Sequence, residues 1–457
     1  MASPRTTIDR LGLVLPLLVV ACRCGGGDST ADADADAGCS FASCDEECRA
    51  VGRCYGSCVS GVCGCSTSCD GGGDADDVAP DDGGRDDATP VDDGGDVVVE
   101  TREGGTAGIT CQHVPTASRR LLPPAAGWRN IVAFSEWVET PSGHVFAIRE
   151  YDSTTRSLRT LDDLGDVPGA GVGSRISYYP SIEGDWVAFG AVGQLAPDTA
   201  VVQLRLVNRR TGEKRVLATG SGDLDHTESV DFVVLRYPWV VWRQVSEETY
   251  WYSWTGWYMN IDTGEKAEII PGYGGVVNLD LLGTTAVVSG GVRAVDLITG
   301  LATEVFPGEA DQWAGVITPN WIAWLDQVEH PSGSWFSPYG TDVYGQNRST
   351  GEIVPLVNSP GMHGPELDGE GDWLAYMDRR DEPNPWYEIE RSDNIYALHL
   401  PTMTEVCVED WPGYQVTPTV YQGTDGMRVF FFEDLGAATL FDLWDCNLPT
   451  PAAGDGP

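Results

Sequence analysis

Short runs of aromatic and β-branched residues recur along most of this chain, and polar turns separate them. The run Trp186–Phe189 reads WVAF, and related tetrads begin at residues 131, 239, 285, 321, 373 and 428. Four consecutive residues of these types suit a strand that is buried on both faces. The tetrads begin between 36 and 55 residues apart, a spacing that is typical of a repeat architecture.

A second pattern follows most tetrads: a strand, a turn that contains Thr-Gly, and a further strand. Glycine adopts the positive φ that a two-residue hairpin turn requires. We therefore expect four strands per unit, which in the second unit lie near Ile176–Ile182, Asp185–Gly190, Val201–Asn208 and Glu213–Ala218. Seven such units without helical periodicity predict an all-β, seven-bladed β-propeller over residues 108–447. Irregular spacing around the fourth unit leaves a six-bladed propeller as the alternative.

The two ends of this region predict how the ring closes. The seventh unit has candidate strands at Arg428–Phe432 and Thr439–Trp444 but no fourth strand, whereas Ile109–Leu122 is strand-like and precedes the first tetrad. Pairing the N-terminal strand into the last blade would remove an open edge.

Closure of that kind places one cysteine from each end on neighbouring strands. We therefore predict a disulfide between Cys111 and Cys446, with Cys407 on the sixth outer strand as the competing partner.

A separate group of eight cysteines crowds into residues 39–69. An even number of closely spaced cysteines in an exported chain predicts a disulfide-rich segment. A zinc site is the alternative, but the segment contains no histidine, the usual companion ligand. The expected disulfide cysteines are Cys39, Cys44, Cys48, Cys54, Cys58, Cys63, Cys65 and Cys69.

The N-terminus carries an export signal. Residues 1–21 place two arginines before an apolar run that is too short to span a bilayer, which predicts a signal peptide. The ending Leu18-Val19-Val20-Ala21-Cys22 resembles a bacterial lipoprotein lipobox, which implies lipidation at Cys22 and a membrane anchor made of acyl chains. Arg23 follows in place of the Asp that commonly retains lipoproteins at the inner membrane, so the outer membrane, facing the periplasm or the surface, is favoured.

Acidic low-complexity sequence surrounds the cysteine-rich segment. Residues 22–38 form an acidic tether, and residues 70–107 are rich in Asp and Gly with almost no large apolar side chain. Such composition cannot bury enough apolar area to offset ordering entropy, so we expect a disordered linker there and a disordered tail over 448–457. The net charge of −41 excludes nucleic acid as a natural partner, because phosphate binding needs clustered Lys and Arg.

The repeat resembles the TolB-type propeller repeat. Pro180–Phe189 reads PSIEGDWVAF, similar to that family's pattern of Pro, hydrophobic residue, Gly-Asp, hydrophobic residue and aromatic residue, and Asp393–Leu398 reads DNIYAL, similar to its following strand. The resemblance covers residues 108–447 and implies the propeller fold. It implies no single activity, because one fold carries many functions.

Aromatic residues in long loops after the tetrads are candidate ligand contacts. Flat rings suit stacking on sugars or gripping a peptide, although packing between blades is the alternative. The candidates are Trp251, Trp254, Trp257, Trp335 and Trp386.

Three histidines fall on the same predicted face. His226, His330 and His363 lie near carboxylates and could together hold a divalent metal, as in TolB-like lyases that act on acidic sugars. An acidic protein also places carboxylates beside histidines by chance, so we expect no resident cofactor.

No catalytic motif stands out in the chain. We find no G-x-S-x-G elbow, no H-E-x-x-H pair and no phosphate-binding P-loop. The sequence therefore predicts a non-enzymatic binding or scaffolding module whose partner is an envelope protein or a glycan. A metal-dependent carbohydrate lyase and a purely structural surface repeat are the alternatives.

Overall fold

The computed structural model divides the chain into two compact units, Met1–Arg85 and Asp86–Pro457. In the first unit, β1 (Gly56–Val59) and β2 (Val62–Cys65) pair as an antiparallel hairpin within the cysteine-rich segment. The predicted signal peptide, the lipidation cysteine and the disulfide pairing of this segment lie outside the described residues. The structure describes residues 56–59, 62–65, 100–140, 143–168, 175–196, 199–222, 230–246, 253–271, 278–306, 312–327, 341–357, 363–378, 380, 393–411, 414–435 and 440–450.

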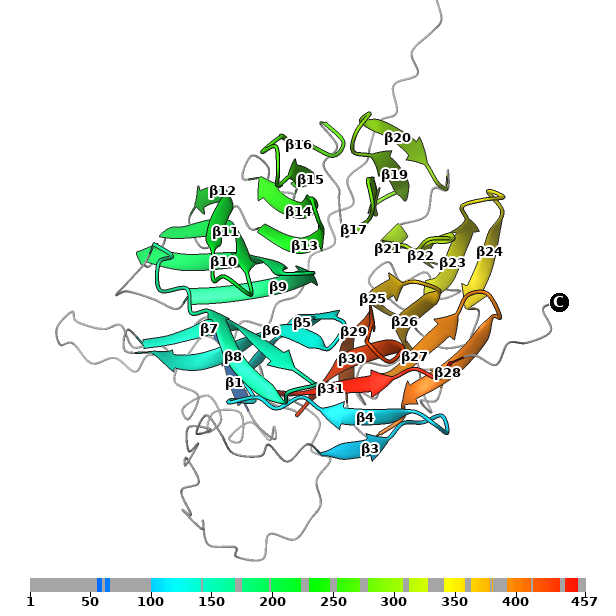
Figure 1. The fold of residues 1–457 in the computed structure, drawn as a ribbon, viewed down its shortest axis with the longest axis horizontal. Helices are drawn as coiled ribbons and strands as arrows, with labels where there is room; N and C mark the ends of the chain where they lie inside the picture. Colours follow the sequence, from blue (N-terminus) through cyan, green and yellow to red (C-terminus); the bar gives the residue numbers. More distant parts are fainter. Residues whose placement is uncertain are drawn as a thin grey trace, which may run out of the picture. The chain divides into compact units, whose positions relative to one another are not determined.

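The second unit is the predicted seven-bladed β-propeller, with antiparallel sheets around a central axis (Figure 1). The first three blades are β5 (Leu121–Trp128), β6 (Ile131–Thr140), β7 (Gly143–Asp152) and β8 (Ser157–Asp162); β9 (Arg175–Glu183), β10 (Trp186–Ala196), β11 (Thr199–Asn208) and β12 (Lys214–Gly222); and β13 (Val230–Arg236), β14 (Trp239–Ser246), β15 (Ser253–Asn260) and β16 (Lys266–Glu268). The next three are β17 (Leu279–Leu282), β18 (Thr285–Val288), β19 (Arg293–Asp296) and β20 (Leu301–Glu304); β21 (Gln312–Ile317), β22 (Trp321–Gln327), β23 (Thr341–Asn347) and β24 (Ile353–Val357); and β25 (His363–Glu370), β26 (Trp373–Asp378), β27 (Asn394–His399) and β28 (Thr404–Glu409). The seventh is β29 (Tyr414–Gln422), β30 (Met427–Asp434) and β31 (Phe441–Asn447), completed by β4 (Thr110–His113) and β3 (Thr101–Glu103).

The recurring tetrads form the second strand of each blade, as predicted. Val187, Ala188 and Phe189 in β10 are fully buried, and every residue of β26 is buried as well. Adjacent blades cover both faces of such a strand, so the strand needs apolar residues at consecutive positions. The short spacing near the fourth unit, which left six blades open, comes from four-residue strands throughout the fourth blade.

The N-terminal strand closes the ring. β4 pairs with β31, and Cys111 forms the predicted disulfide with Cys446, with their Cα atoms 3.9 Å apart. The competing partner, Cys407, instead donates its thiol to the carbonyl of Glu409. Two details differ from the prediction: Leu121 and Leu122 already belong to the first blade, and β3 extends the last sheet before Gly108, where the sequence placed the domain boundary.

The Thr-Gly turns are longer than the two-residue turns expected. Oδ1 of Asn208 accepts N–H bonds from Arg210 and Thr211, at 3.0 and 2.9 Å, before Gly212 reverses the chain with a φ of +72°. A short polar side chain that accepts N–H bonds two and three residues ahead closes such a turn locally. The same arrangement starts at Asn260, Asp296 and Asn347.

Among the described residues, no helix is long and apolar enough to cross a membrane.

Candidate functional site

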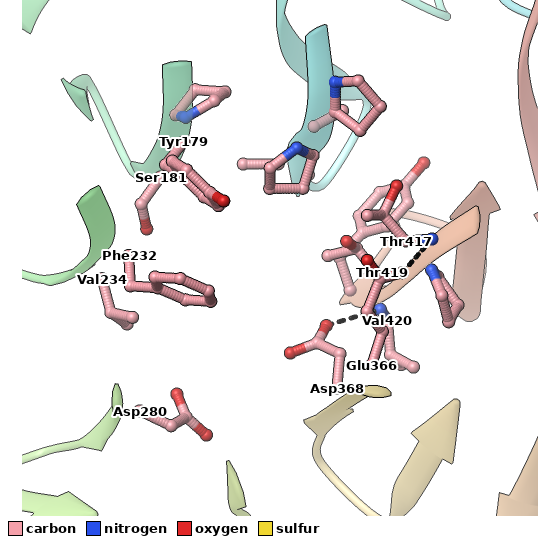
Figure 2. A pocket seen from close by; sticks show the side chains of 18 of the residues that line it. Tyr179, Ser181, Phe232, Val234, Asp280, Glu366, Asp368, Thr417, Thr419 and Val420 are labelled. Atoms are coloured by element: carbon pink, nitrogen blue, oxygen red, sulfur yellow. Dashed lines mark hydrogen bonds between the residues drawn. The ribbon is translucent and has the colours of Figure 1, made fainter. Parts of the chain in front are cut away.

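A cavity of about 720 Å³ lies on the propeller axis (Figure 2). Its walls are the innermost strands of all seven blades, β5, β9, β13, β17, β21, β25 and β29. The volume falls within the range of small-molecule sites, and no single segment of sequence supplies its lining.

Backbone irregularities in the inner strands shape this lining. Every inner strand except β17 shifts register against its neighbour at the cavity, as a β-bulge does. Tyr179, Phe232, Ala314 and Thr417 adopt positive φ there, between 46° and 52°. Two equivalent positions in or beside each inner strand line the cavity: Pro124, Tyr179, Phe232, Asn278, Ala314, Glu366 and Thr417 at one, and Ala126, Ser181, Val234, Asp280, Val316, Asp368 and Thr419 at the other.

One side of the cavity is aromatic and apolar. The rings of Tyr179 and Phe232 stack with centroids 4.8 Å apart, and Val234 lies beside them. The guanidinium of Arg243 lies 4.1 Å from the Phe232 centroid and 4.3 Å from that of Trp254. On this side, a cation–π contact with Arg243 therefore helps to hold the Phe232 ring in place.

The opposite side carries Glu366 and Asp368, and Asp280 lies below the aromatic residues (Figure 2). Each of these carboxylates accepts a backbone N–H from the following blade. Asp280 accepts from Ile317 at 2.7 Å, Asp368 accepts from Val420 at 2.8 Å, and Glu366 accepts from Thr417. Ser181 uses its hydroxyl oxygen in the same way toward Leu235, at 2.9 Å.

Burial sets the ionisation of these acids. It raises the pKa of Asp280 to about 7, that of Glu366 to about 7 and that of Asp368 to about 6. Backbone N–H donors lower all three values, and the nearby Arg236 lowers those of Asp280 and Asp368, but these effects do not compensate for lost solvation. Near neutral pH these carboxyl groups are therefore partly protonated.

An ion pair crosses the cavity near the hairpins that end the inner strands. Arg236 of the third blade donates from Nη2 to Oε2 of Glu370 in the sixth blade, at 2.7 Å. Burial lowers the pKa of Arg236, but the charges of Glu370, Asp280, Glu183 and Asp368 outweigh that effect and raise it. The Arg236 guanidinium therefore interacts electrostatically with several carboxylates.

Of the five tryptophans predicted as ligand contacts, the structure describes Trp254 and Trp257. Trp254 and Trp257 lie within β15, where the sequence had placed a loop, and the odd separation along a strand sends them to opposite faces. Trp257 stacks on Trp242 with centroids 6.4 Å apart, and the Lys266 ammonium lies 4.6 Å from its ring. Trp251, Trp335 and Trp386 lie outside the described residues.

The predicted metal-binding histidines are not brought together by anything the structure describes. His226 and His330 lie outside the described residues, and only the backbone of His363, at the start of β25, is described. Within the described ranges, no three His, Cys, Asp or Glu side chains converge closely enough to hold a metal ion.

The sequence reasoning missed the cavity acids because it searched the loops. Ser181, Asp280 and Asp368 each stand five residues before the start of a tetrad, in the same column of the repeat. Polar residues in a column that also holds Ala126, Val234 and Val316 were the available signal.

Comparisons with known proteins identify the fold. No protein-family model and no curated protein matches this chain. Among solved structures, an oligogalacturonate lyase in complex with manganese is 12% identical with a TM-score of 0.50, covering 77% of this chain and 96% of that one. The β-propeller domain of the Trilobed protease from Pyrococcus furiosus, which has an open velcro topology, is 11% identical with a TM-score of 0.51, covering 72% and 93%. At these identities the likeness shows a propeller fold and nothing about activity.

Proposed function

We propose that this chain is an exported binding module whose propeller takes a ligand in its axial cavity. The observation that carries the proposal is the unequal lining of that cavity, with Tyr179 and Phe232 facing Glu366 and Asp368. A largely apolar hollow with a few converging polar groups is the usual form of a ligand site.

The lining favours binding over the lyase alternative. In their ionised forms Asp280, Glu366 and Asp368 would repel a polyuronate, which carries a carboxylate on each sugar. The described lining residues include no histidine, lysine or cysteine, so the candidate bases of the lyase alternative are these same three carboxylates.

A lipid anchor at Cys22 would hold the module at the envelope. The lipobox-like ending of the signal sequence supports this part of the proposal. A Cys22→Ser variant expressed in a bacterial host should lose incorporation of labelled fatty acid and appear in the soluble fraction. Equal labelling of both proteins would contradict the anchor.

A large side chain that fills the cavity tests whether the cavity is the binding site. Thr419 lies in the wall of the cavity, so Thr419→Trp should fill part of it. Thr303→Trp, on the exposed outer strand of the fourth blade, is the matched control. Full-length wild type and both variants are compared for retention of a glycan array, purified peptidoglycan and a set of synthetic peptides.

The outcomes separate the candidate functions. Retention that Thr419→Trp abolishes and Thr303→Trp preserves supports the cavity as the site. Retention that both variants preserve places binding elsewhere and overturns the proposal. No retention of any probe by the wild type favours the purely structural repeat.

A further inference from the structure

We propose that the axial cavity recognises an organic cation, a guanidinium or ammonium group carried on an apolar stem. This inference rests on the proposed binding function and names the chemical class of the ligand. The same chemistry occurs in free amines and in the Arg or Lys side chains of a peptide, and the experiment below distinguishes the two sources.

The charges that line the cavity are not balanced. Its lining contains five carboxylates and two guanidinium groups, and one of those, Arg243, lies between aromatic rings. The other, Arg236, forms its ion pair with Glu370. Three of the other four carboxylates, Asp280, Glu366 and Asp368, accept hydrogen bonds from backbone N–H groups, and Arg236 is the cation near Asp280 and Asp368.

Neutral N–H donors compensate a buried carboxylate only in part. A buried anion is stable when a cation pairs with it or when it takes up a proton. Burial raises the pKa of Asp280, Glu366 and Asp368, which favours proton uptake by these carboxyl groups when no cation is bound. A cation entering the cavity would replace those protons and restore the charged forms.

The geometry favours an organic cation over a metal ion. Asp280 belongs to the fourth blade, whereas Glu366 and Asp368 belong to the sixth. A metal ion needs its ligands within a few ångströms, and no such group of three exists among the described residues. A guanidinium or an ammonium on a chain is larger and donates several hydrogen bonds in different directions.

The aromatic side of the cavity would bind the apolar stem of the ligand. Tyr179, Phe232 and Val234 face Glu366 and Asp368 across the cavity, so an apolar stem lying on them would direct its charged end to the acids (Figure 2). The chain already contains one guanidinium on these rings, since Arg243 lies 4.1 Å from the Phe232 centroid. A stem with a terminal charge matches both surfaces.

The proposal predicts binding that strengthens with pH. The charged groups that face the three acids are Arg236 from β13, Glu370 from β25 and Asp393 before β27. Of these, only Arg236 is positive, so it cannot neutralise all of the acids as they ionise. Affinity should rise, and protons should be released on binding, between about pH 5.5 and about pH 8.

Titration calorimetry on the full chain tests this inference. The probes are agmatine, an N-acetylated and amidated hexapeptide with one central arginine, and the same peptide with citrulline, which has the same shape without the charge. Buffers of different ionisation enthalpy report the protons released. Tighter binding of agmatine identifies a free amine as the source, whereas tighter binding of the arginine peptide identifies a protein side chain.

Isosteric variants locate the interaction. Glu366→Gln with Asp368→Asn keeps an acceptor for the N–H groups of Thr417 and Val420 but removes both charges. We expect cation affinity to fall on the order of tenfold or more, as for lost hydrogen bonds to charged groups. Glu304→Gln, on the exposed fourth-blade edge, makes the same kind of change remotely and should have no effect.

Each result decides the matter. Preference for arginine over citrulline, lost in the double variant with an unchanged melting temperature, supports the inference. Equal binding of the arginine and citrulline peptides overturns the cation while leaving the binding function in place. Absence of binding by agmatine and both peptides, with a glycan retained in a Thr419→Trp-sensitive manner, also overturns the cation alone.

Discussion

Arg236 of the third blade lies 2.7 Å from Glu370 of the sixth blade, so an ion pair joins two blades that are not neighbours in the ring. Both side chains face the cavity and keep 26% and 32% of their surface exposed. Arg236 is also the cation that Asp280 and Asp368 share. This ion pair therefore connects two distant blades and also places a positive charge near the cavity acids.

Replacing Arg236 with Met should destabilise the propeller on the order of 3 kcal/mol near pH 8, because Glu370 is left without its partner in a confined site. The loss should be smaller near pH 5, where Asp280 and Asp368 hold protons and repel one another less. Urea unfolding at both pH values measures it, and Arg236→Met with Glu370→Met should recover part of the loss. An equal loss at the two pH values would count against the shared-cation interpretation.

The stability of the wild type should fall as pH rises from about 4.5 to about 7. Asp280, Glu366 and Asp368 have folded-state pKa values raised to about 7, 7 and 6, so the folded chain binds more protons than the unfolded chain across this window. Their contribution is fully present below the unfolded pKa values and is lost as pH passes the folded values. Urea midpoints against pH give the slope, and a flat profile would contradict it.

Glu409 extends this dependence to higher pH. Burial raises the pKa of its carboxyl to about 9, despite the N–H that Trp411 donates to it. A Glu409→Gln variant should therefore lose less stability than the wild type between about pH 7 and about pH 9. Parallel curves for the two proteins in that range would show that Glu409 is already ionised.

Removing the Cys111–Cys446 disulfide should cost on the order of 4 kcal/mol, because it closes a chain segment with a sequence separation of 335. The variant carries Cys111→Ser and Cys446→Ser, and its unfolding midpoint in urea is compared with that of the wild type. Cys407→Ser is the control, and we expect a change below about 1 kcal/mol there, since serine keeps a donor for the Glu409 carbonyl that the thiol contacts. A double variant as stable as the control would contradict this prediction.

Trp257→Ala should destabilise the third blade on the order of 2 kcal/mol and leave ligand retention unchanged. The ring packs against Trp242 and the Lys266 ammonium within the blade, and it does not line the cavity. Trp257→Phe should restore most of the stability, because it keeps a stacked ring. Loss of glycan retention in a folded Trp257→Ala protein would contradict this prediction and indicate that Trp257 contacts the ligand.

The repeat made the fold predictable from the sequence. Burial on both faces forces residues such as Val187 and Phe189 to be apolar at consecutive positions, so the second strands stand out. Closure was predictable as well, because the seventh unit lacks an outer strand and Cys111 and Cys446 lie at opposite ends of the repeat region. Both predictions needed only the local composition of the chain and a count of the repeat units.

The site could not be predicted in the same way. Its lining takes residues from every blade, so Asp280 and Asp368 come to one cavity only when the ring closes. Trp254 and Trp257 misled the sequence reasoning, because an aromatic-rich segment with Ser, Thr and Gly reads as a loop although it pairs with β14 as a strand. The positive φ of Tyr179 and Phe232 has no sequence signature of the kind glycine gives.

The Cys111–Cys446 disulfide also determines how the propeller bears mechanical force. All seven tetrads lie between the two cysteines, so the blades form part of one covalent loop. A pull between the two ends of the chain passes directly from residue 111 to residue 446 and bypasses the blades. A pull on the N-terminal side alone can peel β3 and the start of β4 but stops at Cys111. An anchored protein built in this way would keep its ring closed under load until the disulfide is reduced.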